Sequence, residues 1–471
     1  YYIRGNYEIK SKIKSKRKIK IKSKIFMKYL IIPKRIVTND LNDTILSNHA
    51  VEIIDGKISA IYDLKFFDKE NYKGEIHHYP DLTLIPGFVQ THIHLCQTLL
   101  RGLADDLQLL DWLQYRIFPF ENAHDKNSLR ASVQVGINEL LRGGTTCILD
   151  MGTLRHQEVI FEELIKSGLR AFAGNCLIDE NDLFPQFKST TKEQLDYTYS
   201  LAKEFHNKES GRIKFGFAPR FVLSCSEELL KESFNMKKDF DSAVYHTHSS
   251  ENKNEIAEVR KRYGKENIEY FHSIETIDDH SVFAHCIHTT ENEIKLMKET
   301  GLRVAHCPSS NLKLASGIAN IPRYLKEGIS VSLGADGAPC NNNLSALTEM
   351  RLAALIQKPV HGATMMDAKT VFKLATIEGA KALHLQDEIG SIEAGKKADL
   401  VLMNLNSPFN SYIESDDSIF SDIVYSSGVN NIHSVIVEGK WLVREYQSLV
   451  YDETEIVRES NSELQKLLKR V

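Results

Sequence analysis

The sequence is poor in the features that mark disulfide-stabilised, zinc-ribbon or membrane proteins. Its seven cysteines are scattered over 471 residues and form no C-x-x-C pair. A disulfide framework and a zinc ribbon are therefore not expected, and a reducing compartment fits best. No apolar run approaches about 18 residues, the length needed to span a bilayer. These absences predict a cytoplasmic protein that does not bind a membrane.

Charge is nearly balanced overall but unevenly distributed. The chain has 59 Lys and Arg against 63 Asp and Glu, and ten of the basic residues lie in residues 1–26. The rest of the chain is therefore acidic, and no nucleic-acid partner is expected. We expect residues 1–26 to be a disordered extension without a function, because Met27 looks like the natural start of the first strand. A membrane-surface or nucleic-acid arm is the alternative for this segment.

The composition, 42% hydrophobic and 26% charged, is that of a globular protein with room for one large domain and a smaller one. In the middle of the chain, short apolar segments typical of buried strands alternate with charged amphipathic stretches typical of helices. The strand-like segments are the one leading into His92 and residues 145–151, 169–176, 213–219, 243–248, 281–285, 302–306 and 329–334. Eight parallel strands with crossover helices predict a (β/α)8 TIM-like barrel, a fold of the α/β class.

The two ends of the chain have a different sequence pattern, with short strand-like runs separated by turns at glycine. Such runs follow Met27 and return near the C-terminus, so the two ends are expected to form one small β-sandwich domain together. The expected boundaries are 27–84 and 387–450 for the sandwich, 85–386 for the barrel and 451–471 for a C-terminal helix.

Two histidines separated by one residue, His92 and His94, end the first barrel strand. Residues two apart in a strand point to the same face, so these imidazoles would project together. Two histidines on a wet strand edge are the alternative, but barrel active sites lie where the strands end. The other strand ends carry His248, His285, His306 and Asp336. Three neutral imidazoles and a carboxylate suit a divalent metal ion, zinc first, with iron or manganese as alternatives.

Some of these positions have a second interpretation. His246 and His248 share a strand face, so only one of them need be a ligand. His306 fits a supporting role near the metal as well as a plain structural one. Arg220 stands at the end of the fourth strand, where a lysine would be needed to bridge a second metal. One metal ion per chain is therefore expected.

Two carboxylates beside the predicted ligands point to hydrolysis. Glu251, three residues after His248, would lie at the start of the next loop, where it can shuttle a proton between a water nucleophile and a leaving group. Asp336 can bind the metal and accept a proton from that water. A bound metal lowers the pKa of water from 15.7 toward about 7, which makes hydroxide available at neutral pH. The alternative for Glu251 is a helix N-terminal charge worth about 0.3–1 kcal/mol.

Taken together, several motifs resemble the amidohydrolase superfamily, in its mononuclear-metal aminohydrolase branch. They include PGFVQTHIH, LRGLADDLQLLDWL, HSSEN, AHC, HCPSSNLKLASGIA, GADGAPCNN and IGSIEAGKKADLVL. The resemblance extends from Met27 to about residue 450. The metal ligands that it implies are His92, His94, His248 and Asp336, which selects His248 over His246. It also implies Glu251 as the proton shuttle and His285 as the residue that polarises the water or the substrate ring.

Within that branch the chain resembles deaminases of adenosines modified at the 5′ position (5′-deoxyadenosine, methylthioadenosine and S-adenosylhomocysteine). This resemblance implies hydrolytic deamination with release of ammonia, and it implies that Glu121 binds the ribose hydroxyls. Arg220 departs from the pattern, because the adenosine enzymes more usually have a histidine there and guanine deaminases are closer in this segment. Asn341 and Asn342 favour the adenosine group. Deamination of guanine or another oxopurine, with Arg220 as a substrate-binding residue, and triazine-type (chloro)hydrolysis are the alternatives.

A non-catalytic scaffold is the alternative from a different class of protein. Catalytically dead relatives of such barrels have usually lost metal ligands, and none of the expected ligands is missing here. Trp112 lies in an apolar helix and fits the core as well as a stacking platform for a purine. The expected partner is a small purine nucleoside or base, and the expected assembly is a homo-oligomer.

Overall fold

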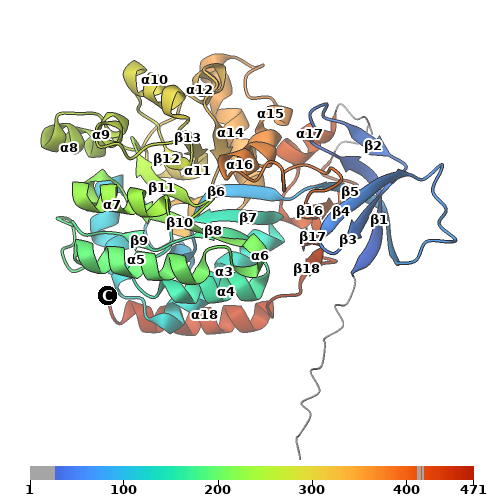
Figure 1. Ribbon diagram of the computed structural model, residues 1–471, viewed down its shortest axis with the longest axis horizontal. Helices are drawn as coiled ribbons and strands as arrows, with labels where there is room; N and C mark the ends of the chain where they lie inside the picture. The colour runs from blue at the N-terminus through green and yellow to red at the C-terminus, as the bar shows by residue number, and fades with distance from the viewer. Residues whose placement is uncertain (1–26, 411–414, 416–417) are drawn as a thin grey trace, which may run out of the picture.

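The computed structural model describes residues 27–410, 415 and 418–471. The disorder expected for residues 1–26 lies outside the described residues. Two bodies are visible in Figure 1: a barrel wrapped by helices, and a mixed β-sheet beside it. In the described part of the chain, no helix is both long and apolar enough to cross a membrane.

The predicted barrel is confirmed. Its eight parallel strands are β6 (Phe88–His94), β7 (Thr145–Asp150), β8 (Arg170–Ala173), β10 (Ile213–Pro219), β11 (Val244–Ser249), β12 (Ser281–His285), β13 (Arg303–His306) and β14 (Val331–Leu333). The two-residue strand β15 (Asp336–Gly337) then pairs in parallel with β6, with Asp336 opposite Ile93. This pairing joins the last strand to the first, so residues at the ends of distant strands meet at one mouth of the barrel.

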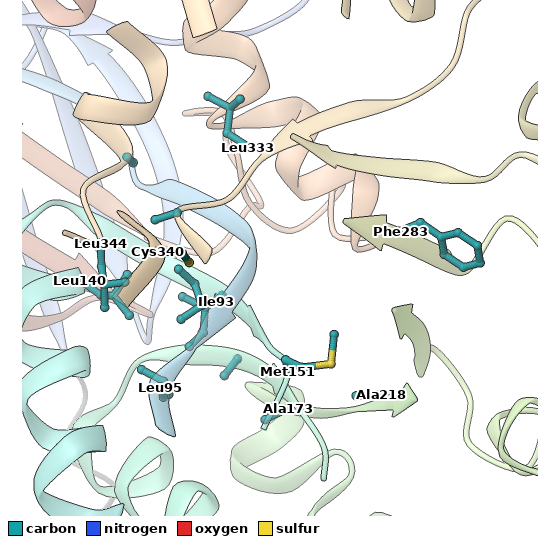
Figure 2. Packing of buried hydrophobic residues seen from close by; sticks show 14 of the residues in the cluster. Ile93, Leu95, Leu140, Met151, Ala173, Ala218, Phe283, Leu333, Cys340 and Leu344 are labelled. Atoms are coloured by element: carbon teal, nitrogen blue, oxygen red, sulfur yellow. The ribbon is translucent and has the colours of Figure 1, made fainter. Parts of the chain in front are cut away.

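Amphipathic helices cover the outside of the barrel. They include α3 (Lys126–Arg142), α4 (Gln157–Ser167), α5 (Thr191–Phe205), α7 (Glu227–Lys237), α8 (Lys253–Tyr263) and α10 (Glu291–Thr300). Thr190 and Thr290 begin two of them with complete capping boxes, which satisfy amide groups that a helix start leaves unbonded. Side chains such as Ile93 on β6, Met151 directly after β7 and Phe283 on β12 belong to one buried cluster, and Figure 2 shows them. The core therefore supports the strand ends rigidly.

Strands from both ends of the chain build the second body. β1 (Lys28–Val37), β3 (His49–Ile54), β4 (Lys57–Asp63) and β5 (Glu75–Pro86) come from the N-terminal part, and β16 (Leu400–Met403), β17 (Ile432–Val437) and β18 (Lys440–Arg444) from the C-terminal part. They form one continuous path, because β5 pairs in parallel with β1 and antiparallel with β16. The final helix α18 (Glu453–Leu468) packs along α3 of the barrel.

A buried ion pair joins the two bodies. Arg170, at the start of β8, donates from Nε and Nη2 to the two carboxylate oxygens of Asp399 over 2.8 and 3.1 Å. Asp399 also accepts from the backbone N–H of Glu438, in the turn between β17 and β18. Both side chains of the pair are almost completely buried. A fork-to-fork pair of this kind fixes geometry as well as charge.

Replacing Asp399 with alanine is expected to lower the free energy of unfolding by about 3 kcal/mol, because it leaves the Arg170 guanidinium buried without its main partner. Urea titration followed by circular dichroism would measure the change. Glu291→Ala is a suitable control, since Glu291 pairs with Arg323 on an exposed surface and should change stability by less than about 1 kcal/mol. Equal effects in the two variants would contradict the interpretation.

Candidate metal centre and active site

Four predicted ligands meet at the mouth of the barrel. One ligand atom from each of His92, His94, His248 and Asp336 lies within 4.8 Å of every other. Asp336 Oδ1 is 3.2 Å from His92 Nε2 and 3.3 Å from His94 Nε2, and the Nε2 atoms of His94 and His248 are 3.2 Å apart. Bonds of about 2.0–2.1 Å from a central zinc ion to four tetrahedral ligands place those ligands at about this separation.

Hydrogen bonds determine which nitrogen of His92 is free. His246 Nδ1 lies 2.8 Å from the carbonyl oxygen of Val282, which only accepts, so Nδ1 is the donor and Nε2 of His246 is an acceptor. His92 Nδ1 therefore donates to His246 Nε2 over 2.8 Å. The buried Nε2 of His92 is left with a lone pair and no hydrogen-bond partner. His246 thus orients a predicted ligand and has a hydrogen-bond partner at each of its own ring nitrogens.

The same reasoning applies to His248. Its Nδ1 donates to the carbonyl oxygen of Arg220 over 2.6 Å, so its Nε2 also presents a lone pair. Two imidazole lone pairs and a carboxylate oxygen consequently face one point in a buried space. Burial lowers the pKa of His92, His94 and His248, which keeps the imidazoles neutral. This donor set fits a divalent cation and would be repulsive without one.

One further group of metal-ligating side chains lies among the described residues, formed by Asp279, His280 and His384. The rings of His280 and His384 are stacked, with centroids 3.8 Å apart and planes 11° from parallel. His280 Nδ1 lies 3.0 Å from Asp279 Oδ1, and all three side chains are at least partly exposed. His384 Nε2 also lies 2.9 Å from the backbone oxygen of Asp279. The barrel mouth is therefore the better metal site.

Two further titratable groups face the ligands. Glu251 Oε2 lies 3.5 Å from His285 Nε2, and His285 Nε2 lies 3.9 Å from Asp336 Oδ2. Burial raises the pKa of Glu251 to about 7, although the nearby His285 opposes the shift. Glu251 lies two residues before α8, outside its first turn. Glu251 Oε1 and His285 Nε2 are buried and have no hydrogen-bond partner, which leaves both available to a substrate.

His285 and Asp336 are held in unusual backbone conformations. Their φ angles are +73° and +61°, in a region that residues other than glycine rarely adopt. Such conformations cost on the order of 1–3 kcal/mol each and persist where the surroundings impose them, often at active sites. His285 is further fixed by Asn311, whose Oδ1 accepts from His285 Nδ1 over 2.8 Å.

Arg220 and Glu121, predicted as separate substrate contacts, form a buried ion pair. Arg220 Nη1 lies 3.0 and 3.2 Å from the two Glu121 oxygens, and Nη2 lies 3.3 Å from Oε1. Gln97 Nε2 donates to the same Oε1 over 2.7 Å. Arg220 is among the residues that line the pocket beside the metal ligands, whereas Glu121 lies behind it. The two residues therefore act as one unit.

Apolar side chains close the pocket around these groups. Leu109, Trp112, Phe221 and Leu314 line it together with the ligands, and its free volume is about 20 Å³. That space holds about one water molecule, so a purine would enter only as these side chains move. The Trp112 Nε1–H is buried and has no partner, which is unusual for a buried indole. His306, also buried, makes no hydrogen bond through either ring nitrogen.

Several supporting residues were missed from the sequence. Gln97, Ser310 and Asn311 each hold a site residue through its side chain. Nothing about an isolated glutamine, serine or asparagine indicates such a role. Ser310 and Asn311 lie within one family motif, and Gln97 lies between two others, which was the only available signal.

The chain matches a known family and several named relatives. A model of the amidohydrolase family matches residues 83–442. The 5′-deoxyadenosine deaminase of Methanosphaera stadtmanae is 36% identical over 384 residues, which cover 81% of this chain and 87% of that protein. The 5-methylthioadenosine/S-adenosylhomocysteine deaminase of Moorella thermoacetica is 34% identical over 387 residues, which cover 82% and 87%.

Solved structures share the whole architecture. An adenosine deaminase from Xanthomonas campestris with bound zinc superposes with a TM-score of 0.86 and 29% identity, over 94% of this chain and 99% of that one. The guanine deaminase of E. coli superposes with a TM-score of 0.79 and 27% identity, over 89% and 99%. A barrel whose mouth gathers histidines and an aspartate around one point is the arrangement expected of a metal-dependent hydrolase. The chain belongs to the amidohydrolase family, and it is a hydrolase that acts on C–N bonds other than peptide bonds.

Proposed function

We propose that this protein is a hydrolytic deaminase of adenosine-type nucleosides modified at the 5′ position. The observation that carries the proposal is the convergence of four ligand atoms, Glu251 and His285 on one buried point. Relatives at 34–36% identity over most of the chain have names that specify 5′-deoxyadenosine, methylthioadenosine and S-adenosylhomocysteine deaminases, which supports this substrate class.

His92, His94, His248 and Asp336 would hold one divalent metal ion, which we propose is zinc. When bound, such an ion supplies Lewis-acid chemistry and lowers the pKa of water toward about 7. Glu251 accepts a proton as water adds to the purine carbon that bears the amino group. Glu251 then donates a proton to the amino nitrogen, the C–N bond breaks, and ammonia leaves. The products are ammonia and the inosine analogue, so water supplies the new oxygen and no other reactant is needed.

Other residues of the site orient the substrate. His285 Nε2, which has no partner in the protein, is placed to bond to a substrate ring nitrogen or to the attacking water. Arg220 faces the pocket and Glu121 holds it in place, so we propose that the pair binds the ribose side of the substrate together. The unpartnered Trp112 N–H offers one more donor in the same pocket.

Arg220 also supports a second candidate, the deamination of guanine. A guanidinium is a natural partner for a purine carbonyl oxygen, and the guanine deaminase of E. coli shares the fold at 27% identity. We keep the adenosine class as the main proposal, because the adenosine-type relatives are more similar to this chain.

A panel of purines would decide between the two candidates. Purified protein should release ammonia from 5′-deoxyadenosine, methylthioadenosine or S-adenosylhomocysteine with a kcat/KM at least about tenfold above that for guanine, a difference of about 1.4 kcal/mol in transition-state binding. The opposite order would replace the proposal with guanine deamination. No release from any purine would favour a different ring, such as a triazine, or a scaffold protein.

Glu121→Gln tests the role of the buried pair. The variant should keep its metal but lose about one to two decades in kcat/KM for the nucleosides, because bonds to a charged group contribute about 1.5–3 kcal/mol. Asp399→Asn is a matched control, since it weakens the other buried arginine pair at a distance from the pocket. The control should lower stability and leave kcat/KM unchanged. Equal kinetic losses in both variants would reduce Glu121 to a structural role.

The other properties stay predictions from the sequence. We propose a cytoplasmic homo-oligomer without a nucleic-acid partner, with domain boundaries at residues 27–84 and 387–450 for the sandwich and 85–386 for the barrel. Size-exclusion chromatography with light scattering would test the oligomeric state.

A further inference from the structure

One turn of helix beside the metal centre carries three consecutive side chains that bind three different groups. In α11 (Pro308–Lys313), Ser310 Oγ donates to Asp336 Oδ2 over 2.7 Å, and Asn311 Oδ1 accepts from His285. Ser309 contacts neither of these groups. Its backbone N–H donates to Glu349 Oε2 over 3.1 Å and its hydroxyl to Glu349 Oε1 over 2.5 Å. The turn thus connects two site residues to a carboxylate that lies outside the site.

Glu349 also holds the other side of Asp336. Its Oε1 accepts from Asn341 Nδ2 over 2.9 Å, and the same amide nitrogen donates to the carbonyl oxygen of Ala335 over 2.7 Å. Ala335 immediately precedes Asp336, whose positive φ needs support from its surroundings. Glu349 is therefore hydrogen-bonded to Ser309, which precedes Ser310, and to Asn341, which holds the carbonyl group just before Asp336. Through these two neighbours it supports both segments that contact or flank Asp336.

Burial of the Glu349 carboxylate is unfavourable in free energy, so a carboxylate at this position needs a physical reason. Glu349 lies on α14 (Ala346–His361) and is fully buried, and a buried carboxylate is unfavourable unless it is hydrogen-bonded. An apolar side chain of similar size often gives equal or better stability at such a place. Glu349 is not among the residues that line the pocket and supplies none of the four ligand atoms. A role through Asp336 explains why a carboxylate is there.

We propose that Glu349 is a positioning residue, which holds the segments flanking Asp336 so that Oδ1 faces the histidine ligands while Oδ2 faces Ser310. Residues that orient metal ligands in this way typically change metal affinity or activity about 10–100-fold when they are replaced. The inference rests on the proposed function for its kinetic readout alone. Metal affinity tests it without any substrate.

The chain offers a closely matched control for Glu349. Glu293, on α10, is also fully buried and accepts from the backbone N–H of Ile268, and from the N–H and hydroxyl of Thr290. Burial raises the pKa of both carboxyls to about 7. Glu293 anchors outer helices and touches none of the ligands. Replacing either glutamate with glutamine puts an amide donor against existing donors, so both variants should lose stability.

The test measures zinc affinity of the full-length protein by competition with a chromogenic chelator, together with kcat, KM and the melting temperature. Glu349→Gln is expected to weaken zinc binding about 10–100-fold and to lower kcat of the zinc-saturated protein more than it changes KM. Glu293→Gln should lower the melting temperature similarly but keep zinc affinity and kcat near the wild-type values. If no purine is a substrate, the zinc measurement still decides the role of Glu349.

A double variant tests whether Glu349 and Ser310 act on the same orientation of Asp336. Ser310→Ala removes the bond to Asp336 directly, so combining it with Glu349→Gln should weaken zinc binding little more than the worse single change, because both act on one orientation. Combined with Glu293→Gln, Ser310→Ala should show its own effect unchanged. Should Glu349→Gln fail to fold, Ser309→Ala is the milder probe, with an expected loss of about threefold to tenfold, that of one hydrogen bond. Wild-type zinc affinity in Glu349→Gln, or in Ser309→Ala, would overturn the proposal.

Discussion

A His248→Ala variant is expected to contain no stoichiometric metal and to show no measurable deamination. Three of the four predicted ligand atoms would remain. The site would lose His248 Nε2, one of the two imidazole nitrogens whose lone pair is directed at the predicted metal position. Without the metal, the pKa of water returns from about 7 to 15.7, so the hydroxide available at neutral pH falls by about eight orders of magnitude. Metal analysis of the purified protein, with ammonia release on the best substrate, would measure both effects. Replacing His92, His94 or Asp336 should give the same result.

His384→Ala is the control for this prediction. It removes a histidine from the only other group of potential ligands among the described residues, and it should leave metal content at about one ion per chain. Two tightly held ions in the wild-type protein would contradict the single-metal interpretation. So would full activity after prolonged chelation.

The barrel was predictable because its strands are short, apolar and regularly separated by amphipathic helices. Parallel strands end at one mouth, so the order of strands along the chain is enough to place the histidines and Asp336 together. The closing strand β15 was not predictable, since a strand of two residues has no periodicity to detect. Its pairing with β6 nevertheless carries Asp336 to the ligands.

The contacts between the site residues were harder to predict than the residues themselves. Arg220 and Glu121 are 99 residues apart, and each alone is a plausible contact for a substrate. Their pairing depends on how the helix that carries Glu121, α2 (Phe118–Asn122), packs against the end of β10. Neither local pattern carries information about this packing. The role of His246 could not be predicted either, because it depends on a hydrogen bond to a backbone oxygen on the neighbouring strand. Resemblance to a family selected the predicted ligands, whereas only the structure shows which side chains hold them.

A Glu251→Gln variant is expected to keep its metal and to lose about 10²–10⁴-fold in kcat. Glutamine has nearly the same shape but neither accepts a proton from water nor passes one to the departing amine, and proton transfer of this kind contributes about that factor. The side chain is buried with one oxygen unpartnered, and its pKa of about 7 suits a group that must gain and lose a proton near neutral pH. Metal content equal to that of the wild type, with KM changed little, would separate this loss from damage to the metal site.

Glu258→Gln is the matched control for Glu251. Glu258 lies on α8, the helix that follows Glu251, and pairs with Arg262 at the surface. The kcat of Glu258→Gln should stay within about twofold of the wild-type value, since exposed ion pairs contribute little. If Glu251→Gln also retained near-normal turnover, the carboxylate would not be the proton shuttle. Its burial beside His285 would then be a matter of packing, and the proton would have to move through Asp336, the other carboxylate near His285.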